Sequence, residues 1–234
     1  MGLMIGMEAL WTLGWSREVT ATDASMTGWG VAVSRWDQSA VAACGRLNEK
    51  RRFKCLAARE AQRHALVEVD VSLKEVLPEI DAEDVWVETE GFQEVPSDLL
   101  DFGRWKVRAW NHWRRSEGIL MLEARALIYG LTLRAMSGEF AGCRLLILND
   151  NLAVVCAFAR RRVKKFNLLN QVRKLSGLCL RFGFKVAIRW IPSERNAADE
   201  PSRIVKQIAS TRSCRDQVGS RRTSRWTPCC SPVM

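Results

Sequence analysis

Short apolar runs alternate with turn residues over the first part of the chain. The runs at 19–23, 29–33 and 40–47 predict three consecutive strands, separated by short turns that contain Gly28 and residues 37–39. Strands joined by such short turns pair antiparallel. This part of the chain therefore predicts an antiparallel meander of three strands.

A helical period begins near residue 117. Apolar residues spaced by three or four positions predict a helix over 117–136, namely Ile119, Leu122, Ala126, Leu127, Leu131 and Leu133. The continuous apolar run at 144–149 is typical of a strand covered on both faces. Further helices are predicted at 151–159 and 168–181 and a last strand at 184–190, followed by a short C-terminal helix or turn. A meander followed by βαβ crossovers predicts an α/β fold with a mixed sheet flanked by helices.

The stretch at about 48–115 interrupts this regular order. It contains one possible helix at 56–66, and between His64 and Asp101 it carries twelve acids and one lysine. We expect this stretch to be a long acidic insertion that contributes few core contacts. The expected organisation is an upstream linker at 1–17, a domain at 18–203 with this insertion, and a basic, disordered tail at 204–234.

Composition narrows the class of protein. The chain has 234 residues and 47% hydrophobic residues, enough for a substantial core, but no apolar run of membrane-spanning length. The eight cysteines show no metal-ligand spacing, and the start lacks a secretion leader, so we expect an intracellular protein with no membrane partner. The net charge of +10 favours a polyanionic partner.

Four acids stand where strand ends and a helix face can bring carboxylates together. Asp23 ends the first strand, Glu123 lies within an apolar helical stripe, Asp150 follows the run at 144–149, and Asp199 follows the last strand. Asp150 and Asp199 are also suitable as helix caps, and Glu123 as the partner of a nearby cation. Four converging acids nevertheless predict a site for hard divalent cations, which prefer oxygen ligands.

Four motifs resemble the ribonuclease H domain of retroelement reverse transcriptases. They are Thr22-Asp23-Ala24-Ser25 with Gly28-Trp29-Gly30, Ile119–Ala126, Leu148-Asn149-Asp150-Asn151, and the block that runs from Trp190-Ile191-Pro192-Ser193-Glu194 through Asn196-Ala197-Ala198-Asp199 to Arg203. The resemblance covers roughly residues 18–203 outside the insertion. It implies a ribonuclease H-like, mixed five-stranded sheet and hydrolysis of the RNA strand of RNA–DNA hybrids.

The same resemblance implies how the site works. Asp23, Glu123, Asp150 and Asp199 would be catalytic and would hold two Mg²⁺ ions, with Mn²⁺ as a possible substitute. Ser25 and Asn151 are candidates for contacts with the hybrid, whose RNA strand is recognised by its 2′-hydroxyls. The basic turn predicted between two helices is expected to contact phosphates through Arg160, Arg161, Arg162, Lys164 and Lys165. An upstream reverse transcriptase domain of a polyprotein is a further possible partner.

Several alternatives stay open at the level of sequence. Glu60, in the possible helix of the insertion, is a rival for Glu123 because its distance from Asp23 suits a compact domain better. The chain could also be an inactive nucleic-acid-binding remnant of the same fold. An exonuclease would need an acid at Ser25, and an integrase a glutamate at Asp199, so these related nucleases are less well matched.

Overall fold

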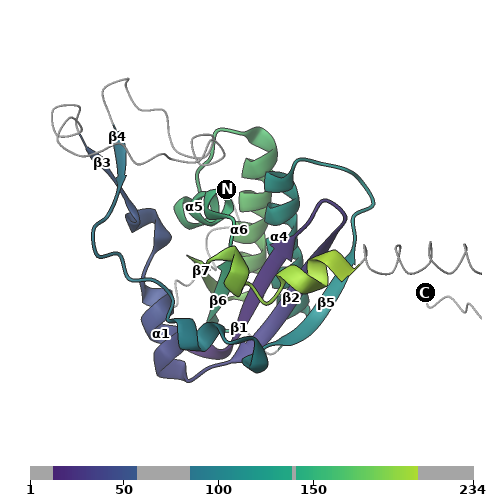
Figure 1. Cartoon of the computed structure of the whole chain (residues 1–234), viewed down its shortest axis with the longest axis horizontal. Helices are drawn as coiled ribbons and strands as arrows, with labels where there is room; N and C mark the ends of the chain where they lie inside the picture. Colours follow the sequence, from purple (N-terminus) through teal and green to yellow (C-terminus); the bar gives the residue numbers. More distant parts are fainter. Residues whose placement is uncertain (1–12, 57–84, 139–140, 205–234) are drawn as a thin grey trace, which may run out of the picture.

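A five-stranded mixed sheet forms the centre of the molecule (Figure 1). The computed structural model describes residues 13–56, 85–138 and 141–204. The strands lie in the order β5-β2-β1-β6-β7; they are β1 (Gly14–Ala24), β2 (Gly28–Arg35), β5 (Lys106–His112), β6 (Cys143–Asn149) and β7 (Lys185–Trp190). β2 pairs antiparallel with β1 and β5, whereas β6 runs parallel to β1 and β7. The predicted fold class, an α/β fold with a mixed five-stranded sheet flanked by helices, is confirmed.

Helices cover both faces of the sheet (Figure 1). One face carries α4 (Ile119–Met136), α5 (Leu152–Arg160) and α6 (Phe166–Phe182), and the other carries α1 (Gln38–Arg46) and a helix that begins at Asp199. Alternate residues of β6 point into the two cores: Leu145 and Ile147 pack with α4 to α6, while Leu146 and Leu148 pack with α1. This double coverage is why the strand is apolar at successive positions.

The second half of the chain folds as its sequence pattern predicts. The helices expected at 117–136, 151–159 and 168–181 are α4, α5 and α6, and the strands expected at 144–149 and 184–190 are β6 and β7. Asn151 caps α5, and Gly183 ends α6 in a left-handed conformation with φ of 66°. These elements have clear end signals and strong apolar patterns.

The third meander strand was predicted in the wrong place. Residues 40–47 are mainly helical, in α1, where Val41 and Cys44 lie three residues apart and are buried together. The third antiparallel strand is β5, inside the stretch expected to be an insertion. β5 is an edge strand whose side chains are nearly all exposed, so it lacks the apolar alternation by which a strand is recognised.

The stretch at 48–115 is consequently more than an insertion. Besides β5 it contains a two-stranded sheet of β3 (Phe53–Leu56) and β4 (Val85–Glu88). It also contains 3-10 turns at Glu49–Arg51, Ser97–Leu100 and Phe102–Arg104. Outside this stretch, a further 3-10 turn follows β7 at Ser193–Arg195. Glu60, and all of the possible helix at 56–66 except its first residue, lie within 57–84, outside the described residues.

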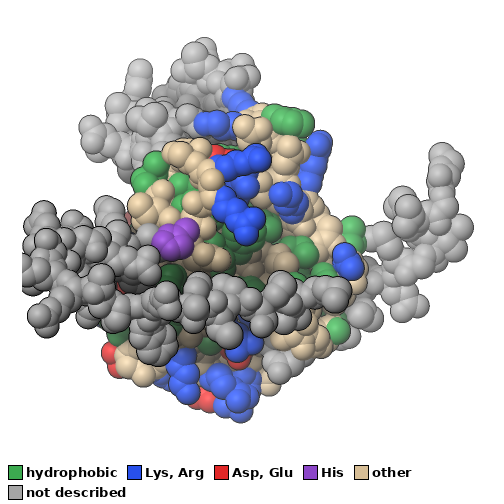
Figure 2. Space-filling model, turned by 90° about the vertical axis from the view of Figure 1, so that its right-hand side faces the viewer, with side chains coloured by type: hydrophobic (Ala, Val, Ile, Leu, Met, Phe, Trp, Pro, Cys, Tyr) green, Lys and Arg blue, Asp and Glu red, His purple; other side chains and the backbone are tan. Residues whose placement is uncertain are grey.

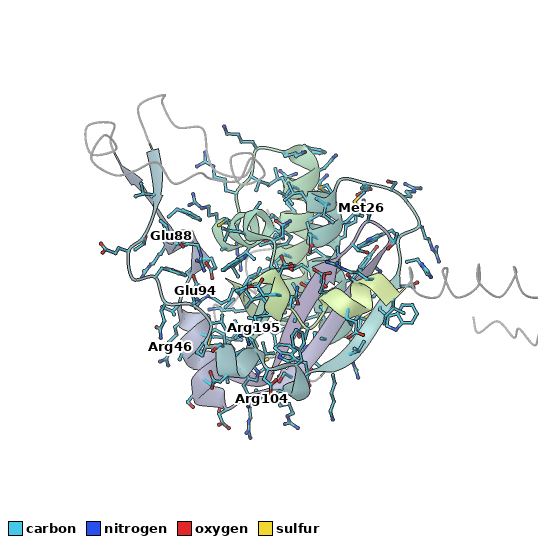
Figure 3. All side chains as sticks on the ribbon, viewed as in Figure 1. Met26, Arg46, Glu88, Glu94, Arg104 and Arg195 are labelled. Carbon is cyan, nitrogen blue, oxygen red and sulfur yellow. The ribbon has the colours of Figure 1, made fainter. Side chains whose placement is uncertain are left out.

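A buried ionic network ties this stretch to the main sheet. Glu49 accepts hydrogen bonds from Arg52 Nε (2.7 Å) and from Arg189 Nε of β7 (2.7 Å), and all three side chains are almost completely buried. Arg52 also pairs with Glu88 and Glu94 at 3.0 and 2.5 Å, on the side of the molecule away from Met26 (Figure 3). The expectation that the stretch contributes few core contacts is therefore wrong.

Within the described residues, no helix has the length and apolar character that crossing a membrane requires.

Candidate metal centre

Three carboxylates from three separate elements meet at one end of the sheet. Asp23 lies near the end of β1, Glu123 in the second turn of α4, and Asp150 directly after β6. One carboxylate oxygen of each lies within 4.8 Å of those of the other two. β1 and β6 are parallel neighbours with Thr22 paired to Asn149, so the residues that follow these two lie at the same edge.

A close approach of α4 to β1 brings Glu123 into this group. At Gly130, seven residues further along α4, an added Cβ would lie 2.8 Å from Cγ2 of Thr22. A glycine at this position therefore lets the helix rest against the strand. Glu123 is consequently only 4% exposed, inside the molecule rather than on a helix surface.

Burial and mutual repulsion raise the pKa values of two of these acids. Burial, the charge of Asp150 and that of Asp199 raise the pKa of Asp23 to about 7, against a smaller opposing effect of Ser202 and Arg203. The pKa of Glu123 is raised well above its ordinary value, by burial first and then by Asp23 and Asp150. Without a cation the cluster therefore tends to retain protons, and a divalent cation would relieve the repulsion.

Two buried asparagines hold the carboxylates in place. Asn149 Nδ2 donates to Glu123 Oε2 (3.1 Å) and to the carbonyl of Thr22 (3.0 Å). Asn196 Nδ2 donates to the same carbonyl (3.1 Å) and, at 3.5 Å, to Asp23 Oδ1. Both are at most 1% exposed. Neither asparagine is among the residues predicted for the site, although a polar residue that ends an apolar run, as Asn149 does, is a signal of such a role.

Asp150 is held from the opposite side and is not a helix cap. Its Oδ2 accepts a hydrogen bond from Ser193 Oγ (2.7 Å), and its carbonyl accepts one from Trp190 Nε1 (2.8 Å). The cap of α5 is the next residue, Asn151, whose side chain accepts from Val154 N (3.1 Å). The alternative interpretation of Asp150 as the cap therefore does not hold.

Asp199 lies beside the cluster rather than in it. It is outside the group of three within 4.8 Å, and its Oδ1 is 2.5 Å from Arg203 NH2 in the same helix. Its charge nevertheless raises the pKa of Asp23, so the two carboxylates face the same region. The structure thus brings three of the four predicted acids together and puts the fourth within electrostatic reach.

The residues predicted to contact nucleic acid are dispersed. The Ser25 hydroxyl donates to the carbonyl of Ser202 (2.8 Å), which ties the turn between β1 and β2 to the C-terminal helix. Among the basic residues of 160–165, Lys165 lines a groove between α4 and α6 with a volume of about 940 Å³. Arg161 instead lines a different hollow with Arg144 and Lys185, at the starts of β6 and β7.

Comparison with known proteins yields a likeness of structure only. No family model and no curated protein matches the chain. Among solved structures, the chain is similar to the N-terminal ribonuclease H domain of Rv2228c from Mycobacterium tuberculosis, determined as a fusion with maltose-binding protein. The identity is 16%, the match covers 84% of this chain and 96% of that chain, and the TM-score is 0.43.

The donor set fits a hard divalent cation. All three side chains offer carboxylate oxygens, and the described residues place no histidine or cysteine in the group. Oxygen-only donor sets suit Mg²⁺, Mn²⁺ or Ca²⁺ rather than zinc or copper. Asp23, Glu123 and Asp150 are thus the residues that could hold a metal ion.

Proposed function

We propose that the chain is a metal-dependent endonuclease that hydrolyses the RNA strand of RNA–DNA hybrids. The observation that carries this proposal is the meeting of Asp23, Glu123 and Asp150 within 4.8 Å at the end of a mixed five-stranded sheet. The motifs around these acids are those that resemble the ribonuclease H domain of retroelement reverse transcriptases. A ribonuclease H-like fold hosts other nucleases too, so the substrate is inferred from the motifs.

In this proposal the acids hold two Mg²⁺ ions. Asp23 and Asp150 would be the central ligands, and Glu123 and Asp199 would complete the set. Bound there, Mg²⁺ would supply an activated water and charge stabilisation for the leaving oxygen. Asn149 and Asn196 keep Glu123 and Asp23 oriented, so that little rearrangement is needed when the cations bind.

The basic groove between α4 and α6 is suited to a phosphate backbone. Lys165, directly before α6, and Arg173 and Lys174 of α6 line it together with Gly118, the residue before α4. Lysine and arginine contacts to phosphates provide affinity without sequence preference. Arg160, Arg162 and Lys164 extend the basic surface in this proposal, whereas Arg161 lines the separate hollow at the starts of β6 and β7. Ser25 and Asn151 are candidates for 2′-hydroxyl contacts near the cluster.

The biological context in this proposal is a retroelement. The block from Trp190 to Arg203 is typical of retroelement polyproteins, so an upstream reverse transcriptase domain is the proposed partner. The domain limits of 18–203 follow the same resemblance, although β1 starts at Gly14.

A second candidate function is binding of nucleic acid without cleavage. The ion pair between Asp199 and Arg203 favours it, because a carboxylate engaged by an arginine is a poorer metal ligand. The two functions differ in one respect only, which is metal-dependent hydrolysis.

A cleavage assay with end-labelled substrates separates the candidates. The purified chain is incubated with an RNA–DNA hybrid, single-stranded RNA and duplex DNA, each with Mg²⁺ or with EDTA. We expect the RNA strand of the hybrid to be cut in the presence of Mg²⁺ and to remain intact in EDTA. Binding of the hybrid without cleavage would favour the second function, and cleavage of duplex DNA would overturn the substrate assignment. Asp37→Asn is a matched control, because that side chain is 84% exposed. Asp37 also follows the far end of β2, seven residues after Gly30, the strand partner of Asp23.

A further inference from the structure

A third pocket lies on the α4 side of the sheet, next to the edge strand β5. Its volume is about 420 Å³, within the range of pockets that hold small ligands. Three aromatic side chains from three elements line it: Trp29 of β2, Trp113 after β5, and Tyr129 of α4. The rings of Trp29 and Trp113 lie 5.3 and 5.9 Å from that of Tyr129, and Tyr129 is 39% exposed.

Cationic side chains surround these rings. Arg114 and Arg115 follow β5 and are exposed, and Arg125 of α4 is paired with Glu117 at 2.7 Å. On the face that includes β5 and α4, Lys and Arg side chains gather around hydrophobic ones (Figure 2). With the one acid of the lining already paired, the pocket favours a ligand that is flat and apolar at one end and anionic at the other.

The pocket adjoins the carboxylate cluster. Trp29 pairs with Ala24, the residue after Asp23, and Leu122 of the lining precedes Glu123. Trp113 Nε1 donates to the carbonyl of Ser25 (2.9 Å), so the pocket wall is attached to the turn that follows Asp23. A ligand in the pocket would thus lie next to a strand bound at the cluster.

We propose that this pocket binds the base of an unpaired nucleotide, with Arg114 and Arg115 on its phosphate. An unpaired base has free faces that can stack on Tyr129, whereas a base inside a duplex has both faces covered by its neighbours. The proposal rests on the proposed function and narrows its substrate to hybrids that carry a single-stranded extension beside the cleaved region. An acidic peptide without an aromatic residue lacks the flat ring that the aromatic wall would accept.

Binding of blunt and extended hybrids tests this proposal. The affinity of the full chain is measured by fluorescence anisotropy in EDTA, for a blunt RNA–DNA hybrid and for the same hybrid with two unpaired deoxynucleotides at one end or the other. Because stacking on an aromatic side chain is strong, we expect one of the extensions to tighten binding about tenfold. Equal affinities for the blunt and both extended hybrids would overturn the proposal.

Variants assign the effect to the pocket. Tyr129→Ala should remove the advantage of the extension, and Tyr129→Phe should keep it, since the ring remains. Leu180→Ala, at an exposed apolar residue of α6, is the control and should change nothing. An equal loss for blunt and extended hybrids in Tyr129→Ala would contradict the proposal.

A second variant tests the pocket independently, in case Tyr129→Ala does not fold. Replacing the exposed Arg114 and Arg115 with alanine should shrink the extension advantage and flatten its salt dependence; an unchanged advantage would contradict the phosphate assignment. Cleavage of the blunt hybrid with Mg²⁺ is scored separately. If the extended hybrid binds more tightly but the blunt hybrid is not cleaved, the proposed function is contradicted and the pocket assignment stands. If the hybrid is cleaved but the extension does not tighten binding, only the pocket assignment is contradicted.

Discussion

At the scale of residues, the defining feature of the candidate site is a group of carboxylates held close together in a buried environment. Asp23, Glu123 and Asp150 repel one another, and two of them are almost fully buried. A protein retains such a group when a ligand of opposite charge compensates it, and the raised pKa values of Asp23 and Glu123 show the cost when none does. Stability and metal binding should therefore both depend on protonation of the cluster.

The pH dependence of the metal-free protein follows from Asp23. Its folded pKa of about 7 is above the unfolded value near 3.8, so the folded state holds more protons between these limits. Stability must then fall as pH rises from about 4 to about 7. The urea midpoint in EDTA should rise for Asp23→Asn relative to wild type as pH increases. A difference between the two proteins that is independent of pH would contradict the raised pKa.

Asn149 offers a second prediction at this scale. Asn149→Ala removes the donor to Glu123 and to the carbonyl of Thr22. Because buried groups lose their partners, we expect a loss of about 1–3 kcal/mol in unfolding free energy, together with weaker Mg²⁺ binding by calorimetry. Asn151→Ser is the control, since serine caps a helix about as well as asparagine and adds no charge beside Asp150. Unchanged Mg²⁺ affinity in Asn149→Ala would show that the amide does not orient the site.

At the scale of elements, the structure depends on contacts that local pattern does not reveal. β5 has no recognisable pattern because an exposed edge strand has no apolar face. The short alanine-rich run of α1 fits both a helix and a strand. The network of Glu49, Arg52 and Arg189 was missed because Glu49 and Arg189 are 140 residues apart in sequence. By contrast, β6 and α4 have patterns strong enough to be recognised alone.

The network predicts that residues 49–52 are integral to the domain. Arg189→Leu would leave the buried Glu49 with one cation fewer, and would leave the carbonyls of Cys44 and Gln93 without this donor. We expect a loss of about 3–5 kcal/mol in urea unfolding, the usual effect of breaking a buried pair. Arg17→Leu breaks an exposed pair with Asp37 (3.3 Å) and should cost under about 1 kcal/mol. Similar small losses in both variants would show that the network is dispensable.

At the scale of the whole molecule, the fold brings together three of the four acids that the sequence motifs single out. Asp23, Glu123 and Asp150 were predicted from motifs far apart in the chain, and the fold brings them within 4.8 Å. Asp199 was grouped with them but lies beside them, because a sequence motif does not specify where a helix after the last strand points its carboxylate. The hydrogen bonds from Asn149 and Asn196 to the acids, and the aromatic pocket, join residues far apart in sequence, so they are recognised only in the folded structure.

The central claim is that this carboxylate cluster holds the metal ions that cleave the hybrid. Asp150→Asn tests it most directly, because the change is isosteric and Asn151, not Asp150, caps α5. The account predicts that the variant still binds a labelled RNA–DNA hybrid, loses cleavage in Mg²⁺, and shows a smaller Mg²⁺-induced rise in melting temperature than wild type. A variant that cleaves the hybrid at the wild-type rate would contradict it.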